Sequence, residues 1–366
     1  MEIKAAVLNA PHAPFDIETV QLSEPSENEV LVKLVATGLC HTDLAVQHQA
    51  IPLPCPVVLG HEGAGIVEKV GAAVTKFKAG DKVVLTMAFC GECENCKRGD
   101  LMYCENQAAM NYAGARPDGS ATLCRHDAPI TGAFFGQSSF ATYALCNARN
   151  AVKLPDDADL QMAAPLGCGV QTGAGAVMKS LDAQPGRSLA VFGGGAVGMS
   201  AVMAAVARGC SPIIVVEPVK ARRELALSIG ATHAIDPADG DTTEQIRAIV
   251  ARGIDYAVET TGIPPVLNSA IKAMAVHGHL GMIGVPSDPA ATIELNLFAT
   301  LSQALRFTAI IEGDSTPDAF IPEMYELYRQ GKFPLEKLIA TYPFEQINQA
   351  IEDQGAGKVL KPVLVF

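Results

Sequence analysis

The chain has 366 residues and a formal net charge of −12 at pH 7. That length predicts about two domains, each large enough to bury its own core, and the acidic balance argues against nucleic acid or an anionic membrane as the main partner. The residues after Met1 form neither an apolar signal-type block nor an Arg/Ser-rich transit pattern, so we expect a cytoplasmic protein. Ten cysteines in a reducing compartment indicate metal binding or core packing before disulfides.

Short apolar runs separated by proline and acidic turns open the sequence. Residues 5–8 and 30–35 are two of these runs, and their spacing predicts the strands of a β-rich, barrel-like domain. Directly afterwards, residues 40–43 bring together a thiol, an imidazole, a hydroxyl and an acid. Taken alone, Cys40 would be interpreted as a small buried residue.

Two later residues change that interpretation. His61 lies in a glycine-flanked turn after a proline-rich run, and Cys168 stands between two glycines. With Cys40 they would supply two thiolates and one imidazole, and three protein ligands leave open the fourth position of a catalytic zinc. Three unrelated core residues remain the alternative, because distance along the chain does not show that they meet.

The strongest local cysteine pattern is a polar loop. Its four thiols are separated by two, two and seven residues, at Cys90, Cys93, Cys96 and Cys104. Four thiolates close the coordination of one zinc, so this ion would hold a loop rather than react. Disulfides are the alternative. The remaining cysteines show no such spacing and are interpreted as packing residues: Cys55, Cys124, Cys146 and Cys210.

Aromatic residues gather in one stretch of an otherwise aromatic-poor chain. Residues 134–145 hold three of the 13 phenylalanines and one tyrosine. A strand core explains this stretch as well as a substrate pocket does, since pockets are also largely apolar and aromatic.

A glycine fingerprint marks the second half of the chain. An apolar run, 189–192, leads into Gly193, Gly195 and Gly198 and then into an alanine-rich segment, which predicts strand, turn and helix. The glycines permit the turn, the approach of a pyrophosphate and close helix packing. Residues 189–207 are long enough for a membrane span, but three consecutive glycines favour the buried strand, turn and helix.

An acid follows at the spacing that this fingerprint requires. A second apolar strand, 213–216, ends in Glu217, nineteen residues beyond Gly198, where a ribose diol needs an acceptor. Four nearby or later cations are candidate phosphate contacts, although each alone would ordinarily be a solvated charge: Lys220, Arg222, Arg223 and Lys361.

Strands and helices alternate after Glu217. Helices are predicted over 220–229, 243–251 and 266–275, and strands over 231–235, 256–259 and 279–285. The alternation predicts a doubly wound parallel sheet. It stops near residue 310, and a final helix (320–330) and strand (358–365) are expected to return to the first domain. We therefore expect a catalytic domain formed by 1–169 with 311–366, and a coenzyme domain formed by 170–310.

Together and in this order, the motifs resemble those of the zinc-dependent medium-chain alcohol dehydrogenases. The resemblance covers the whole chain. It is strongest to the bacterial aryl- and allyl-alcohol enzymes, those of benzyl alcohol and of geraniol or perillyl alcohol, over 134–145, 165–176, 320–334 and 344–348. The resemblance implies an α/β protein with a GroES-like β-rich catalytic domain and a Rossmann coenzyme domain.

The resemblance also implies roles for the residues near the metal sites. Cys40, His61 and Cys168 match the catalytic zinc ligands, and the four-cysteine loop matches the structural ones, giving two zinc ions per chain. Thr42 falls at the hydroxyl that hydrogen-bonds the substrate oxygen. Asp43 falls at the carboxylate that orients the ligating histidine, and Glu62 at the acid behind the zinc.

Other positions match coenzyme and substrate contacts. Thr172 and Val197 line up with nicotinamide contacts, and His41 and Lys361 with the pyrophosphate. Phe134, Phe135 and Val285 fall in the alcohol pocket. Many relatives carry a proton-relay histidine where this chain has Ala45, so the relay would end at the ribose hydroxyls and water, or at His48.

The implied reaction is the reversible oxidation of a primary aromatic or allylic alcohol to its aldehyde, by hydride transfer from a zinc-bound alkoxide to NAD. Because Glu217 would repel a 2′-phosphate, NAD is expected over NADP, with Arg222 and Arg223 leaving NADP open. A polyol or thiol-adduct dehydrogenase of the same family is the nearest alternative. A non-catalytic dinucleotide-binding protein and a zinc module for nucleic acid or protein binding are more distant ones. We expect a homodimer or homotetramer paired through the coenzyme domain, without nucleic-acid or membrane partners.

Overall fold

The computed structural model describes residues 1–366 and divides into two compact units. The first comprises Met1–Cys168, Thr316–Tyr325 and Leu338–Phe366, and the second comprises Gly169–Ser315 and Glu326–Lys337. The expected return of the C-terminal segment to the first unit is therefore interrupted. Residues 326–337 belong to the second unit, and one boundary falls within helix α11 (Pro317–Arg329).

The first unit contains two β-sheets, as the short apolar runs predicted. Strand β1 (Glu2–Leu8) pairs antiparallel with β2 (Phe15–Leu22) in a sheet of order β4-β1-β2-β7-β8. The second sheet has the order β10-β6-β5-β3-β18-β17, with β9 also paired to the long strand β3 (Glu29–Gly38). The other strands of the first sheet are β4 (Val57–Val58), β7 (Leu123–Arg125) and β8 (Ala128–Ile130). Those of the second sheet are β5 (Gly63–Val70), β6 (Lys82–Leu85), β9 (Tyr143–Asn147), β10 (Ala151–Lys153), β17 (Ile339–Pro343) and β18 (Lys361–Val365).

Apolar residues of these strands form the core of the first unit. Val30, Val32 and Leu34 alternate along β3, and together with Val83 and Leu85 of β6 they are buried in one cluster. Short helices lie at the ends of strands or in the loops between them: α1 (His41–Gln47), α2 (Glu94–Arg98), α3 (Gln107–Asn111), α4 (Leu160–Ala163) and α12 (Ile347–Gly355).

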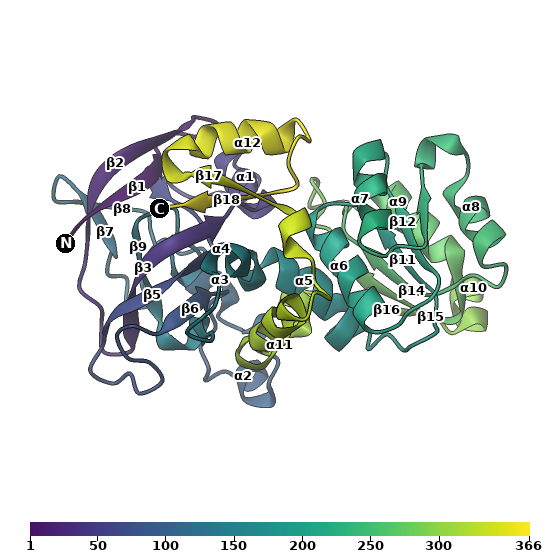
Figure 1. Cartoon of the computed structure of the whole chain (residues 1–366), viewed down its shortest axis with the longest axis horizontal. Helices are drawn as coiled ribbons and strands as arrows, with labels where there is room; N and C mark the ends of the chain where they lie inside the picture. The colour runs from purple at the N-terminus through teal and green to yellow at the C-terminus, as the bar shows by residue number, and fades with distance from the viewer. The chain divides into compact units, whose positions relative to one another are not determined.

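The second unit is built on one six-stranded parallel sheet, which confirms the predicted doubly wound fold (Figure 1). The strand order is β13-β12-β11-β14-β15-β16. The strands are β11 (Leu189–Phe192), β12 (Ile213–Val216), β13 (His233–Ile235), β14 (Ile254–Glu259), β15 (Met274–Met282) and β16 (Arg306–Ala309), and the helices are α5 (Gly169–Gly175), α6 (Ala196–Ala207), α7 (Lys220–Ser228), α8 (Thr242–Ile249), α9 (Pro264–Ala273) and α10 (Leu297–Gln303).

This strand order places a crossover at β11. The chain moves from β11 outward through β12 to β13, then returns to the other side of β11 with β14. In open parallel sheets, ligands bind outside the carboxyl ends of the strands at such a reversal. The glycine fingerprint follows β11 directly and therefore stands at that position.

Two predictions about this unit have different outcomes. No helix of the structure has the length and apolarity to cross a membrane, and the apolar stretch 189–207 is divided between β11 and α6. The strand expected over 279–285 was misplaced, because β15 begins at Met274 and ends at Met282. The amides of Ile283 and Gly284 both donate to the carbonyl of Glu259, which turns the chain away from the ladder.

Candidate metal centres and coenzyme site

The first candidate metal centre begins at the N-terminus of helix α1. Cys40 is the N-cap residue with an extended backbone (φ −116°), and its amide donates to Asp43 Oδ2 at 3.0 Å. This bond satisfies one of the amides that helix starts leave unpaired. The helix start thus fixes Cys40 and Asp43 relative to each other.

Asp43 also fixes His61. Its Oδ1 accepts hydrogen bonds from the Gly60 amide and from His61 Nδ1, each at 3.0 Å. Both Asp43 and His61 are fully buried. With its Nδ1 proton donated to a carboxylate, the imidazole keeps a lone pair on Nε2, which is the arrangement typical of metal-ligating histidines.

Four donor side chains meet at this point. Ligand atoms of Cys40, His61, Glu62 and Cys168 all lie within 4.8 Å of one another, and His61 Nε2 is buried without a hydrogen-bond partner. An unpaired buried nitrogen costs about 1–3 kcal/mol, so its retention indicates a ligand. A hydrogen bond with Cys168 holds the pKa of Cys40 well below its ordinary value. Two thiolates and an imidazole fit zinc.

The fourth member of the group, Glu62, is paired with a cation. Its Oε2 lies 2.5 Å from Lys361 Nζ, and Lys361 also donates to the carbonyl of Leu39 at 3.1 Å. Burial raises the pKa of Glu62 to about 7, while Lys361 opposes that rise. A Cβ on Gly38 would lie 1.9 Å from Glu62 Oε2, so only glycine fits there. Lys361, expected at the pyrophosphate, is 3% exposed, whereas His41 is exposed.

Aromatic rings cover His61. The ring of Phe135 stacks on the imidazole with centroids 4.5 Å apart, and Phe134 meets the imidazole edge-on at 5.5 Å. Phe135 has a left-handed backbone (φ 51°, ψ 32°), which is unusual for a bulky side chain. Tyr112, whose ring meets both phenylalanines edge-on, was not identified from the sequence. The only sequence feature that distinguishes Tyr112 from other tyrosines is its position within a polar loop.

Two further predicted residues lie as follows. Thr42, half-buried on α1, has its hydroxyl 3.8 Å from the sulfur of Cys40. Val285, expected in the alcohol pocket, belongs to the second unit and is 83% exposed after the end of β15.

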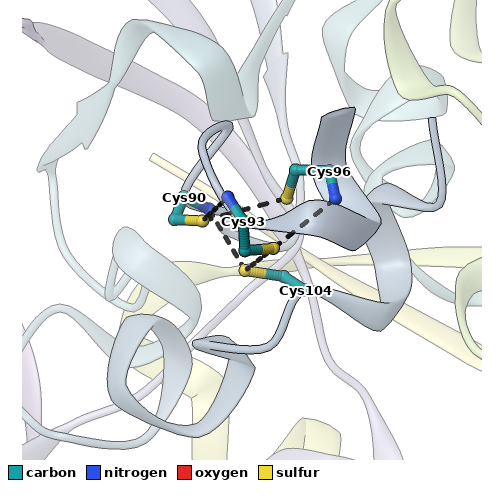
Figure 2. A group of neighbouring side chains, drawn as sticks. All are labelled: Cys90, Cys93, Cys96 and Cys104. Carbon is teal, nitrogen blue, oxygen red and sulfur yellow. Dashed lines mark hydrogen bonds between the residues drawn. The ribbon is translucent and has the colours of Figure 1, made fainter. Parts of the chain in front are cut away.

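The second candidate metal centre is the four-cysteine loop around α2. Figure 2 shows the four sulfur atoms turned toward one another. The sulfurs of Cys90 and Cys96 are 3.9 Å apart and those of Cys93 and Cys104 are 4.0 Å apart. Thiolates bound to one tetrahedral zinc lie about 3.8 Å apart, whereas a disulfide requires about 2.05 Å. All four thiols are free, so the disulfide alternative does not hold in this structure.

Backbone amides prepare this loop for thiolates. The amides of Glu92 and Cys93 donate to Cys90, and those of Cys96 and Glu105 donate to Cys93. Although burial acts in the opposite direction, the bonds to Cys90 lower the pKa of its thiol to about 6. Because zinc binds the deprotonated thiol, the loop fits a structural zinc ion.

The candidate coenzyme site stands after β11 in the second unit. Gly193 has a φ of 98°, and a Cβ on Gly198 would lie 1.9 Å from the carbonyl oxygen of Gly193. A Cβ on Gly195, by contrast, would meet nothing within 4 Å. The outer glycines are therefore required by the turn and by helix packing, and the middle one faces open space where a pyrophosphate can approach. Val197 is half-buried in the first turn of α6.

The acid expected to bind the ribose is held at the end of β12. Glu217 is 3% exposed and accepts the amide of Gly194 at 2.6 Å and that of Val219 at 2.9 Å. Arg222 lies 4.0 Å from its carboxylate, and Arg223 is paired with Asp236 at 2.7 Å. One of the two nearby cations is thus already neutralised.

A buried acid beside Thr172 was missed by the sequence analysis. Glu312 is 6% exposed, and its Oε2 accepts Gln171 Nε2 at 2.9 Å and the Thr172 hydroxyl at 3.4 Å. Residues 312–314 all have positive φ, and a Cβ on Gly313 would lie 2.5 Å from the carbonyl oxygen of Gln171. The only sequence signal was an acid and a glycine directly after two isoleucines, Ile310 and Ile311.

Family models, a sequence relative and solved structures all match this chain to alcohol dehydrogenases. Residues 26–156 match the alcohol dehydrogenase GroES-like domain, and residues 196–328 match the zinc-binding dehydrogenase model. The chain is 46% identical to geraniol dehydrogenase of Castellaniella defragrans, over 99% of this chain and 97% of that protein. A zinc-binding-domain alcohol dehydrogenase protein from Burkholderia ambifaria superposes with a TM-score of 0.98 at 48% identity, covering 100% and 99% of the two chains. Benzyl alcohol dehydrogenase from Acinetobacter calcoaceticus gives 0.97 at 41%, with the same coverage.

Proposed function

The chain belongs to the zinc-dependent medium-chain alcohol dehydrogenases, and we propose that it oxidises a primary aromatic or allylic, terpene-like alcohol reversibly to its aldehyde with NAD. The observation that carries the proposal is the cluster of Cys40, His61 and Cys168 beside stacked aromatic rings. Relatives named for geraniol and for benzyl alcohol support this substrate class.

Cys40, His61 and Cys168 would hold the catalytic zinc, which supplies a Lewis acid that lowers the pKa of a bound hydroxyl. Asp43 keeps the proton of His61 on Nδ1, so that Nε2 remains a donor to the metal. Lys361 pairs with the carboxylate of Glu62. Three donors then remain for the ion, the number typical of catalytic zinc sites.

Thr42 is the residue that would accept the hydroxyl proton. Its own hydroxyl lies next to Cys40 on the first turn of α1, and it can accept one proton while donating another outward. His48, at the end of the same helix, is exposed and could receive that proton from solvent. The relay would end there or at the ribose hydroxyls, since Ala45 cannot carry a proton.

The aromatic rings favour an apolar, flat alcohol. Phe134 and Phe135 are 1% and 5% exposed, and with Tyr112 they offer ring faces and edges but few hydrogen-bonding groups. A polyol would lose hydrogen bonds to water against such a wall, whereas an aryl or allyl group would gain contacts with it. This contrast argues against the polyol alternative.

The charge at Glu217 supports NAD over NADP. Two backbone amides stabilise its carboxylate, and a 2′-phosphate brought to the ribose would meet that negative charge. Arg223 is engaged by Asp236 and offers that phosphate less compensation. We expect faster turnover with NAD than with NADP.

The second unit offers a surface for pairing two copies. Leu297, Phe298 and Leu301 are 80–81% exposed on helix α10, and β16 is the edge strand of the parallel sheet. An exposed apolar helix face and an open strand edge both favour association. We expect a homodimer or homotetramer by light scattering, weakened by Phe298→Asp but unaffected by Leu227→Asp, which changes an exposed residue on α7.

The deciding experiment is NADH formation from a panel of benzyl alcohol, geraniol, perillyl alcohol, ethanol and sorbitol, with NADP measured beside NAD. We expect benzyl alcohol or an allylic alcohol to give the highest kcat/KM. A clear preference for sorbitol would refute the pocket interpretation, and faster turnover with NADP would refute the role of Glu217. A protein that binds NADH but oxidises no alcohol would instead be a non-catalytic dinucleotide-binding protein.

A further inference from the structure

Two exposed histidines from distant parts of the first unit meet ring to ring. His12 lies in the turn between β1 and β2, and His48 directly follows helix α1. Their Nδ1 atoms are 3.2 Å apart, and the ring centroids are 5.4 Å apart at an interplanar angle of 34°. Neither residue belongs to the two cysteine-containing clusters.

Backbone hydrogen bonds fix the main-chain positions of both residues. The amide of His12 donates to the carbonyl of Gln47 at 2.8 Å, which ties the turn to the last residue of α1. The amide of His48 donates to Leu44 at 2.9 Å. His12 also has a left-handed backbone, with a φ of 62°. Such a conformation is uncommon outside glycine and is retained where the surroundings determine it.

The separation of the two nitrogens is that of two ligands on one metal ion. Nitrogens bound at about 2.0–2.1 Å lie about 3.3–3.4 Å apart on a tetrahedral ion and about 2.9 Å apart at a right angle. The observed 3.2 Å falls between these values. We propose that His12 and His48 form a third, exchangeable metal site for a divalent transition ion such as Zn²⁺ or Ni²⁺.

Binding at this site requires a change of tautomer and a rotation of the exposed rings, so that both Nδ1 atoms point at one ion rather than at each other, but no net loss of protons from the neutral pair. In the pair, one Nδ1–H donates to the other Nδ1, so one lone pair is occupied. Moving that proton to Nε2 of the same ring frees both Nδ1 lone pairs for the ion, and the Nε2–H groups of these exposed residues can donate to water. Water would complete the coordination, which makes the ion more exchangeable than one held by three or four side chains.

Calorimetric titration of the zinc-loaded protein with Ni²⁺ tests the proposal, with the zinc content measured before and after. We expect one Ni²⁺ per chain in addition to two retained zinc ions. His12→Ala and His48→Ala should each weaken Ni²⁺ binding about a hundredfold, because the second imidazole binds intramolecularly. His12→Asn, in which asparagine tolerates the left-handed backbone, should give the same loss without disturbing the turn.

His126→Ala is the matched control, because His126 is also exposed and has a positive φ (48°). It should leave the titration unchanged. Absence of bound Ni²⁺ in the original chain, or equal binding in the His12, His48 and His126 variants, would overturn the proposal and leave only a hydrogen-bonded pair. The result is independent of whether any alcohol is oxidised.

Discussion

Asp43→Asn is the most direct test of how the first metal centre is held. The carboxylate is fully buried and accepts three N–H groups, from Cys40, Gly60 and His61, each at 3.0 Å. The asparagine side chain has the same shape as the carboxylate but only one oxygen. It can keep the two bonds at Oδ1, but its NH₂ group then faces the amide of Cys40.

The expected magnitude follows from that single mismatch. A hydrogen bond to a charged group contributes about 1.5–3 kcal/mol, and a buried donor left unpaired costs a similar amount. We expect the free energy of unfolding of the zinc-loaded protein to fall by about 2–3 kcal/mol. Losing the orienting carboxylate typically weakens metal affinity about 10- to 100-fold.

The assay is competition for zinc with a chromophoric chelator, alongside urea unfolding. We expect release in two phases, of which Asp43→Asn accelerates only one, because the four-cysteine loop does not involve Asp43. Asp239→Asn, at an exposed position, is the matched control and should change neither quantity. If Asp43→Asn holds both ions as tightly as the original chain, the assigned role of this carboxylate is wrong.

Three further changes have expected outcomes. Glu312→Gln should raise KM for NAD about 10-fold, the order of magnitude of one hydrogen bond to a charged group, because it disturbs Thr172. KM for the alcohol should change little. A KM for NAD equal to that of the original chain would contradict this. Cys93→Ser should release the zinc ion of the four-cysteine loop and lower the unfolding temperature, measured by calorimetry, while kcat per folded chain is retained. Hydrogen bonds from Ser188, opposed by burial, hold the pKa of Asp255 below its ordinary 3.8. Asp255→Asn should therefore lower the free energy of unfolding at pH 7, measured by urea titration. The difference in that free energy between the variant and the original chain should shrink as the pH falls below about 4.

Much of the second unit could be predicted because its signals are local. The strands at 189–192 and 213–216 are found at their predicted bounds, since short, continuous apolar runs bounded by turn residues specify buried parallel strands. The roles of Gly193 and Gly198 also follow from local geometry. The strand expected to end at Val285 was misplaced, because its end is set by hydrogen bonds to Glu259, on a neighbouring strand.

The candidate site was only partly predictable. Cysteine and histidine spacing pointed to the two clusters, because few other patterns place such ligands in glycine-rich turns. Tyr112 and Glu312 could not be found in this way, since each acts through neighbours that are distant in sequence. The pairing of Lys361 with Glu62 likewise depends on β18 lying beside β3, which no local pattern encodes.

The discontinuity of the first unit has a consequence for synthesis on the ribosome. Strand β18 lies between β3 and β17 inside its sheet, and it carries Lys361. The second unit contains no residue beyond Lys337, so all of it has been synthesised while the first still lacks an interior strand. Until β18 has been synthesised, Glu62 beside the first metal centre lacks its buried counter-charge, Lys361. Chains that stall before residue 365 should therefore be substrates for proteases.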